Sequence, residues 1–68
     1  MALAESQFSY TVQLSYSRYW PDLSRIWVWI EQHIGHFAQD WTWSIQDDTM
    51  TYCFKTPAAA VEFTLTWL

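Results

Sequence analysis

The chain has 68 residues, a net charge of −4 and a single cysteine, so an internal disulfide is excluded. A domain of this size buries only about 60% of its unfolded surface and needs reinforcement. The six Trp, four Tyr and four Phe are the expected reinforcement, since each aromatic side chain buries on the order of 150–250 Å². They exceed what so small a core needs, so we expect some rings at the surface, where aromatic residues often mark interfaces.

Charge and hydropathy exclude further classes of protein. Only Arg18, Arg25 and Lys55 are positive, which makes the chain a poor ligand for phosphate backbones. No Cys/His spacing is typical of a zinc finger, and no apolar run approaches the roughly 18 residues of a membrane-spanning helix. The segment Met1–Glu5 is too short for a signal peptide. We therefore expect one soluble, cytoplasmic domain over residues 1–68, with no cofactor and no membrane contact.

Residues 7–17 alternate strictly between apolar and polar side chains, which predicts a strand with one apolar face and one polar face. The apolar positions are Phe8, Tyr10, Val12, Leu14 and Tyr16.

A change of period follows the first strand. Pro21 suits the first turn of a helix, and Asp22 suits its positive end. From Leu23 the apolar spacing becomes i, i+3, i+4, i+7, which predicts a helix over residues 21–38. The expected core stripe consists of Leu23, Ile26, Trp27, Ile30, Ile34 and Phe37. Gly35 falls on the far side of this stripe, where it lowers helix stability without affecting packing.

Residues 41–46 and 49–55 alternate again and predict a hairpin around Asp47-Asp48. A two-residue loop pairs apolar residues with one another along the whole hairpin, so turn length and face agree on one register. The predicted pairs are Ile45 with Met50, Trp43 with Tyr52, and Trp41 with Phe54.

The last segment carries two conflicting patterns. Thr56-Pro57 predicts a helix start, with Thr as N-cap and Pro at the first helical position. Residues 61–67 also alternate like a strand. The three alanines before them, and the need to cover the apolar sheet face, favour a helix over residues 57–67.

The order β-α-β-β-α predicts a two-layer α+β fold. A crossover from the first strand to a parallel second strand leaves room for the third strand between them, which gives the order 1-3-2. Both helices would then cover the aromatic face. This arrangement resembles a ferredoxin-like split-βαβ fold that lacks its last strand, with an open sheet edge as a possible pairing site.

The outer sheet face is polar. RNA-recognition domains of this topology stack bases on aromatic side chains of that face, and here it carries no ring. We interpret it as a solvated face, with a polar protein contact or a sheet-to-sheet homodimer as alternatives. Its expected members are Ser9, Thr11, Gln13, Ser15, Thr42, Ser44, Gln46, Thr51 and Cys53.

A candidate contact patch lies on the first long helix. Trp29 falls about 120° from the centre of the core stripe, and Arg25, His33 and His36 are its helical neighbours; Trp and Arg are enriched in binding hot spots. Tyr19 and Trp20 lie beside this patch in sequence. The alternatives are that Trp29 packs against the sheet margin or the second helix, and that Tyr19 and Trp20 form an apolar lid on the helix start.

Metal chemistry has weak support. His33 and His36 are three residues apart and Asp40 follows one turn later, but a mixed set at one helix end is a weak metal signal. We interpret these histidines as solvated, with no metal site.

Catalytic chemistry has no support either. Cys53 has no His placed beside it as a base, and Asp47 and Asp48 are interpreted as turn formers, or at most as an acidic knob for a basic partner. The seven carboxylates are too dispersed to favour a nucleic-acid mimic. We therefore expect no catalytic residue and no enzyme.

The segment from Tyr52 to Trp67 resembles the tails of short bacteriophage proteins. Those tails run aromatic-x-Phe, then a helix start with an Ala, then Phe-x-Leu-x-Trp; the match covers about a quarter of the chain. Length, acidity and surface aromatics are also similar to small phage-encoded inhibitors, including anti-CRISPR and other anti-defence proteins. The resemblance implies a binding protein acting in the cytoplasm of a bacterial host, and it assigns no site residue.

These observations predict a non-enzymatic module that occupies a surface of a larger host protein or protein complex through Tyr19, Trp20, Arg25, Trp29, His33 and His36. Two alternatives remain open. One is a structural homo-oligomer that completes its core through the open sheet edge or the helix faces. The other is a ferredoxin-like nucleic-acid-binding module or a nucleic-acid mimic.

Overall fold

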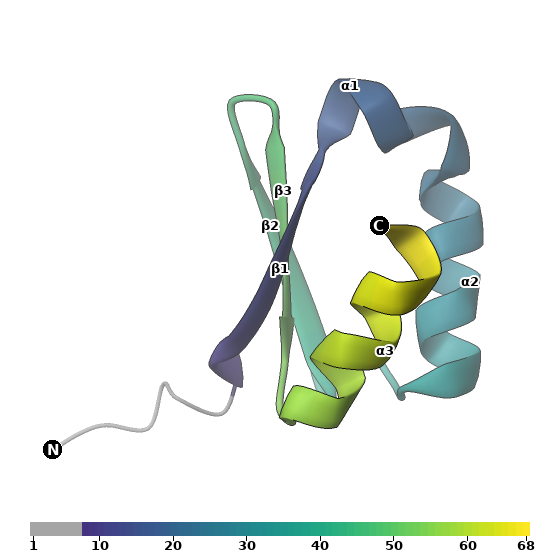
Figure 1. Cartoon of the computed structure of the whole chain (residues 1–68), viewed down its shortest axis with the longest axis vertical. Helices are drawn as coiled ribbons and strands as arrows, with labels where there is room; N and C mark the ends of the chain where they lie inside the picture. The colour runs from purple at the N-terminus through teal and green to yellow at the C-terminus, as the bar shows by residue number, and fades with distance from the viewer. Residues whose placement is uncertain (1–7) are drawn as a thin grey trace, which may run out of the picture.

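The protein folds into two layers, a sheet and a set of helices that lie on one side of it (Figure 1). A computed structural model describes residues 8–68. The elements in chain order are β1 (Tyr10–Ser15), α1 (Tyr16–Tyr19), the 3-10 turn η2 (Trp20–Asp22), α2 (Leu23–His33), β2 (Trp41–Gln46), β3 (Thr49–Phe54) and α3 (Pro57–Trp67).

The sheet has the order β1-β3-β2, and both outer strands run antiparallel to β3. The α+β class and the 1-3-2 order predicted from the sequence are therefore confirmed. The hairpin register is confirmed as well, because Trp41, Trp43 and Ile45 lie opposite Phe54, Tyr52 and Met50. Strand β3 ends one residue earlier than predicted. Asp47 accommodates the two-residue loop with a φ of 57°, in the left-handed region that Asp tolerates better than most residues.

The core lies between the inner sheet face and the helices. Phe63 of α3 is its centre, with ring centroids 5.0 Å from Tyr52 and 5.3 Å from Phe54. Burial raises the pKa of Tyr52 to about 12, so this phenol stays neutral at physiological pH. The buried residues are Val12, Leu14, Ile26, Ile30, Trp41, Met50, Tyr52, Phe54 and Phe63.

The first strand is shorter than the alternation predicts. It covers Tyr10–Ser15, and the predicted start at Gln7 lies outside the described residues. Tyr16 and Ser17, predicted as strand, are helical because Ser15 caps α1 by accepting a hydrogen bond from the Arg18 amide. The prediction failed here because the capping is assisted by Asp48, a residue distant in sequence, whose carboxylate accepts from Ser17 N at 2.9 Å.

The predicted helix over residues 21–38 is also too long. Helix α2 ends at His33, and the Ile34 and Gly35 amides both donate to the Ile30 carbonyl. Gly35 has a φ of 153°, and a side chain at this position would collide with the carboxylate of Asp40. Gly35 therefore terminates the helix, contrary to the expectation that it lies within it.

The last helix is confirmed over residues 57–67. Thr56 caps it by accepting from the Ala59 amide at 3.2 Å, and Pro57 takes the first helical position. Among residues 8–68, no helix has both the length and the apolar character to cross a membrane.

Candidate contact surface on helix α2

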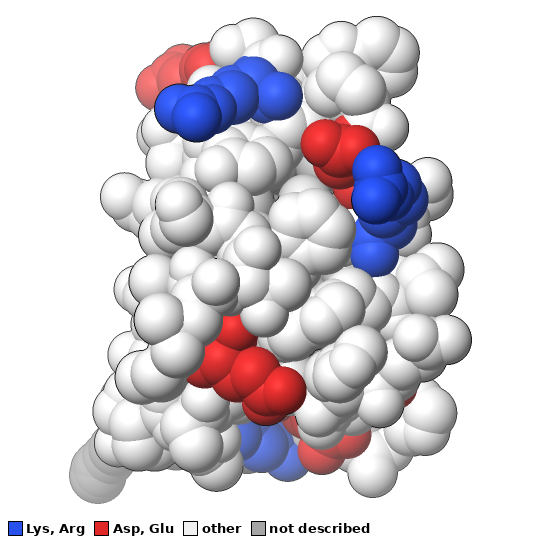
Figure 2. All heavy atoms as spheres, turned by 45° about the vertical axis from the view of Figure 1, so that its right-hand side comes forward, with Lys and Arg blue, Asp and Glu red and all other residues white. Residues whose placement is uncertain are grey.

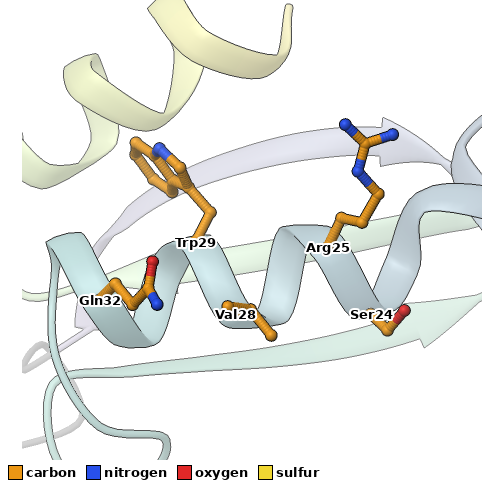
Figure 3. A pocket seen from close by; sticks show the side chains of 5 residues that line it. All are labelled: Ser24, Arg25, Val28, Trp29 and Gln32. Atoms are coloured by element: carbon orange, nitrogen blue, oxygen red, sulfur yellow. The ribbon is translucent and has the colours of Figure 1, made fainter.

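The outward side of α2 carries a shallow hollow of about 340 Å³. Arg25 and Trp29 lie along one side of the helix, with Trp29 pointing toward α3, and Val28 lies on another side (Figure 3). Val28 is 51% exposed although it is apolar. The hollow is lined by Ser24, Arg25, Val28, Trp29 and Gln32.

Trp29 serves the fold and the surface together. Its ring meets Trp67 edge-on at 6.4 Å and Phe63 at 6.0 Å, so it packs between α2 and α3. It is half-buried in that seam, and the rest of the ring lines the hollow. The predicted alternative, in which Trp29 packs against the second helix, therefore describes one face of the ring, and the contact-patch prediction describes the other.

His33 and Arg25 flank Trp29 on the exposed surface. The His33 ring stacks on the Trp29 ring at 4.7 Å between centroids, and its Nδ1 lies 2.9 Å from the Trp29 carbonyl oxygen. Arg25 forms an ion pair with Asp22 at 3.3 Å. Both members of this pair are exposed enough that it contributes little to stability, so the guanidinium is available to another carboxylate.

Tyr19 and Trp20 have different environments. Tyr19 is half-buried and donates from its hydroxyl to the Trp67 carbonyl at 2.9 Å, which ties the start of the helical layer to the end of α3. Trp20, the next residue, is exposed. The lid interpretation therefore fits Tyr19, while Trp20 keeps a free ring.

The structure does not bring His36 next to Trp29. His36 lies beyond the helix end, where its Nδ1 is 3.0 Å from Glu31 Oε1. Glu31 is about 200° round the helix from Trp29, so His36 lies on the opposite flank of α2. The hydrogen bond with Glu31 raises the pKa of His36, and the same bond lowers the pKa of Glu31. Of the four residues predicted as one patch, Arg25, Trp29 and His33 are contiguous and His36 is separate.

The helical spacing predicts Trp27 and Phe37 in the core, and the structure places both at the surface. They are partly exposed and lie against Trp41, with ring centroids 5.0 Å and 5.3 Å away. Phe37 faces outward because α2 ends before it, so that it packs against Trp27 and Trp41 instead of extending the helical stripe. The hollow residue Val28 was also missed, although an apolar residue opposite the core stripe was a signal for it.

The outer sheet face carries polar side chains and a hollow of about 260 Å³ lined by Gln13, Ser44, Gln46, Asp47, Thr49 and Thr51. No ring lines this hollow. The described residues that line this hollow therefore provide no stacking platform of the kind that RNA-binding sheets use.

Within residues 8–68, no group of three or more His, Cys, Asp or Glu side chains could hold a metal ion. Asp40, one of the predicted weak ligands, accepts instead from the His36 amide at 2.8 Å. Cys53 is half-buried, and its thiol lies 4.0 Å from the Thr51 carbonyl oxygen. None of these contacts pairs the thiol with a base.

Much of the side of the molecule that carries α2 and α3 is uncharged, and the charged side chains form small separate groups on it (Figure 2). Comparison with known proteins finds no matching family, no similar curated protein and no similar solved structure. The function is therefore inferred from the surface on α2.

Proposed function

We propose that the chain is a small, non-enzymatic protein-binding module that occupies a surface of a larger protein through helix α2. The observation that carries the proposal is the hollow on α2, which the exposed aliphatic side chain of Val28 lines together with Trp29 and Arg25. Binding hot spots combine such aromatic and Arg side chains with a desolvated apolar centre. The compatible partner presents an apolar side chain to Val28 and Trp29 and a carboxylate to Arg25.

We propose further that the partner is a bacterial host protein and that binding blocks it, as in phage-type inhibitors of the anti-defence or anti-CRISPR kind. The support for this part is the resemblance of residues 52–67 to phage protein tails, together with the small size and the charge of −4. An inhibitor of this kind needs no catalytic group, because occupying the surface is sufficient.

The test is affinity capture from a bacterial lysate with the 68-residue chain as bait, read by mass spectrometry. Val28→Glu places a charge in the hollow and should reduce the recovered partner by about tenfold or more, the equivalent of about 1.4 kcal/mol. Glu is at least as good a helix former as Val, so the circular dichroism spectrum should not change.

Val61→Glu is the matched control, because Val61 is 56% exposed in a helix of the same length but on α3. It should capture the partner as the wild-type chain does. Equal capture by wild type and Val28→Glu would contradict the proposal. Binding to RNA or DNA that survives physiological salt would favour the nucleic-acid alternative instead.

A further inference from the structure

Helix α3 is apolar on both of its sides. Phe63 faces the core and is fully buried, whereas Val61, Leu65 and Leu68 are 56%, 81% and 67% exposed. These three residues are spaced i, i+4, i+7, so they form one stripe that faces away from the core. Glu62 and Thr66 occupy the exposed face next to it, so the stripe is a separate apolar face; an apolar face of a helix is normally covered, and this one has no cover among the described residues.

The stripe runs beside the open edge of β1. A hollow of about 200 Å³ separates the two elements and is lined by Thr11, Val12, Ala60, Val61, Thr64 and Leu65. Strand β1 pairs with β3 on its other side, and no described residue pairs with its outer edge. The unused backbone N–H and C=O groups of such an edge are a template for a further strand.

The two edges of the sheet differ. At β2, the Ala38 amide donates to the Trp41 carbonyl at 2.7 Å, and Phe37 forms a bridge with Trp41, so the connector after α2 covers the start of that edge. The six residues of β1 include no charged residue and no proline, the usual devices that prevent edge pairing. The edge of β1 is therefore the more open one.

Charge supports a second copy as the occupant. The one charged residue of α3 is Glu62, which lines a different hollow with His33, Asp40 and Lys55. Two copies with a net charge of −4 each can therefore meet at β1 and at Val61 and Leu65 without bringing side-chain carboxylates together. A foreign partner steered by charge would need charged residues around the contact, and the residues lining this hollow are all uncharged.

We propose that two copies of the chain dimerise through the edge of β1 and the Val61-Leu65-Leu68 stripe of α3. The two β1 strands pair antiparallel about a two-fold axis that passes through Val12 or through Gln13. An axis at a residue, and not between two residues, places side chains of the same sheet face opposite one another. The two sheets then form one continuous sheet, and both α3 helices lie side by side on the same face. The α2 hollow stays open in this dimer, so the proposal is independent of the proposed function.

The first test is the molar mass of the 68-residue chain by analytical ultracentrifugation between about 1 and about 200 µM, the range of weak to moderate dimers. The wild-type chain should approach the dimer mass. Val61→Glu and Leu65→Glu should each weaken dimerisation by about tenfold or more, and Val28→Glu should dimerise as the wild type does. A wild-type chain that stays monomeric throughout would overturn the proposal.

The second test locates the contact. In a Cys53→Ser background, Gln13→Cys should give dimers with a short thiol cross-linker, because the two-fold axis places Gln13 close to its own copy. Ser44→Cys is the matched control, since Ser44 is exposed on the same sheet face but on the other outer strand. Cross-linking through Ser44→Cys but not through Gln13→Cys would overturn the proposal and place the interface at β2. In the ultracentrifugation experiment, loss of the dimer in Val28→Glu alone would also overturn the proposal and place the interface on α2.

Discussion

Asp48 lies in the turn between β2 and β3, and its carboxylate reaches the end of β1. It accepts hydrogen bonds from Ser15 Oγ at 2.8 Å, from Ser17 Oγ at 2.9 Å and from the Ser17 amide. Its backbone carbonyl also accepts from the Tyr16 amide at 2.7 Å. These bonds stop β1 at Ser15 and start the helical layer there, so one residue of the hairpin sets the boundary of a distant strand.

The hydrogen bonds from Ser15 and Ser17 lower the pKa of Asp48, which predicts a specific pH dependence. A carboxyl with a lowered folded-state pKa stabilises the fold fully above its unfolded pKa of about 4. This stability is lost as the pH falls through the lowered pKa of the folded state. Asp48→Asn should remove that part of the acid dependence and lower stability at pH 7.

The measurement is the urea midpoint of unfolding of the wild type and the variant between about pH 2 and pH 7, a range that spans the titration of carboxyl groups. Asp47→Asn is the matched control, since Asp47 is the other turn residue and Asn tolerates its positive φ. An Asp48→Asn chain with the wild-type midpoint at every pH would show that these bonds contribute nothing to stability.

The seam between α2 and α3 is built by side chains of Trp29, Phe63 and Trp67. Trp67 also has its indole N–H buried without an acceptor among the described residues, so its side chain contributes ring packing to this seam. Losing the Trp29 ring would leave a cavity against α3, with the packing loss that accompanies it.

We expect Trp29→Ala to destabilise the fold by about 2–3 kcal/mol, less than the 3–5 kcal/mol of a fully buried Trp because the ring is half-exposed. Arg25→Ala is the control on the same helix face and should change stability by less than about 0.5 kcal/mol. Urea denaturation measures both. A Trp29→Ala chain as stable as wild type would contradict a packing role for the ring against α3 and leave Trp29 with the surface role alone.

The regular elements were predictable where local pattern and long-range packing agree. The hairpin register follows from alternation and loop length, and α3 follows from Thr56-Pro57 and the alanines. The end of β1 was not predictable in this way, because it depends on contacts of Ser15 and Ser17 with Asp48. The end of α2 did carry a local signal in Gly35, since glycine is common just after the last residue of a helix, but the helical spacing of Ile34 and Phe37 outweighed it. The direction of Trp29 was open because a helical wheel does not say where the second helix lies.

Three surfaces of the described residues differ in composition. The outer sheet face is polar, the α3 stripe beside β1 is apolar and uncharged, and the outer side of α2 combines Val28, Trp29 and Arg25 in one hollow. Of these three, the α2 surface alone has both an apolar centre and a charged group, which is the composition of a specific protein contact. A chain of 68 residues can present three different surfaces because the strands and helices that carry them pack on one aromatic core.

The most direct test of the α2 assignment is a two-dimensional amide and indole NMR titration of the chain with the partner that it captures. We predict that shift changes concentrate on Ser24, Arg25, Val28, Gln32 and the Trp29 indole, the residues that line the hollow. Changes concentrated on Gln13, Ser44 and Thr51 of the outer sheet face, with the α2 signals unmoved, would contradict the assignment.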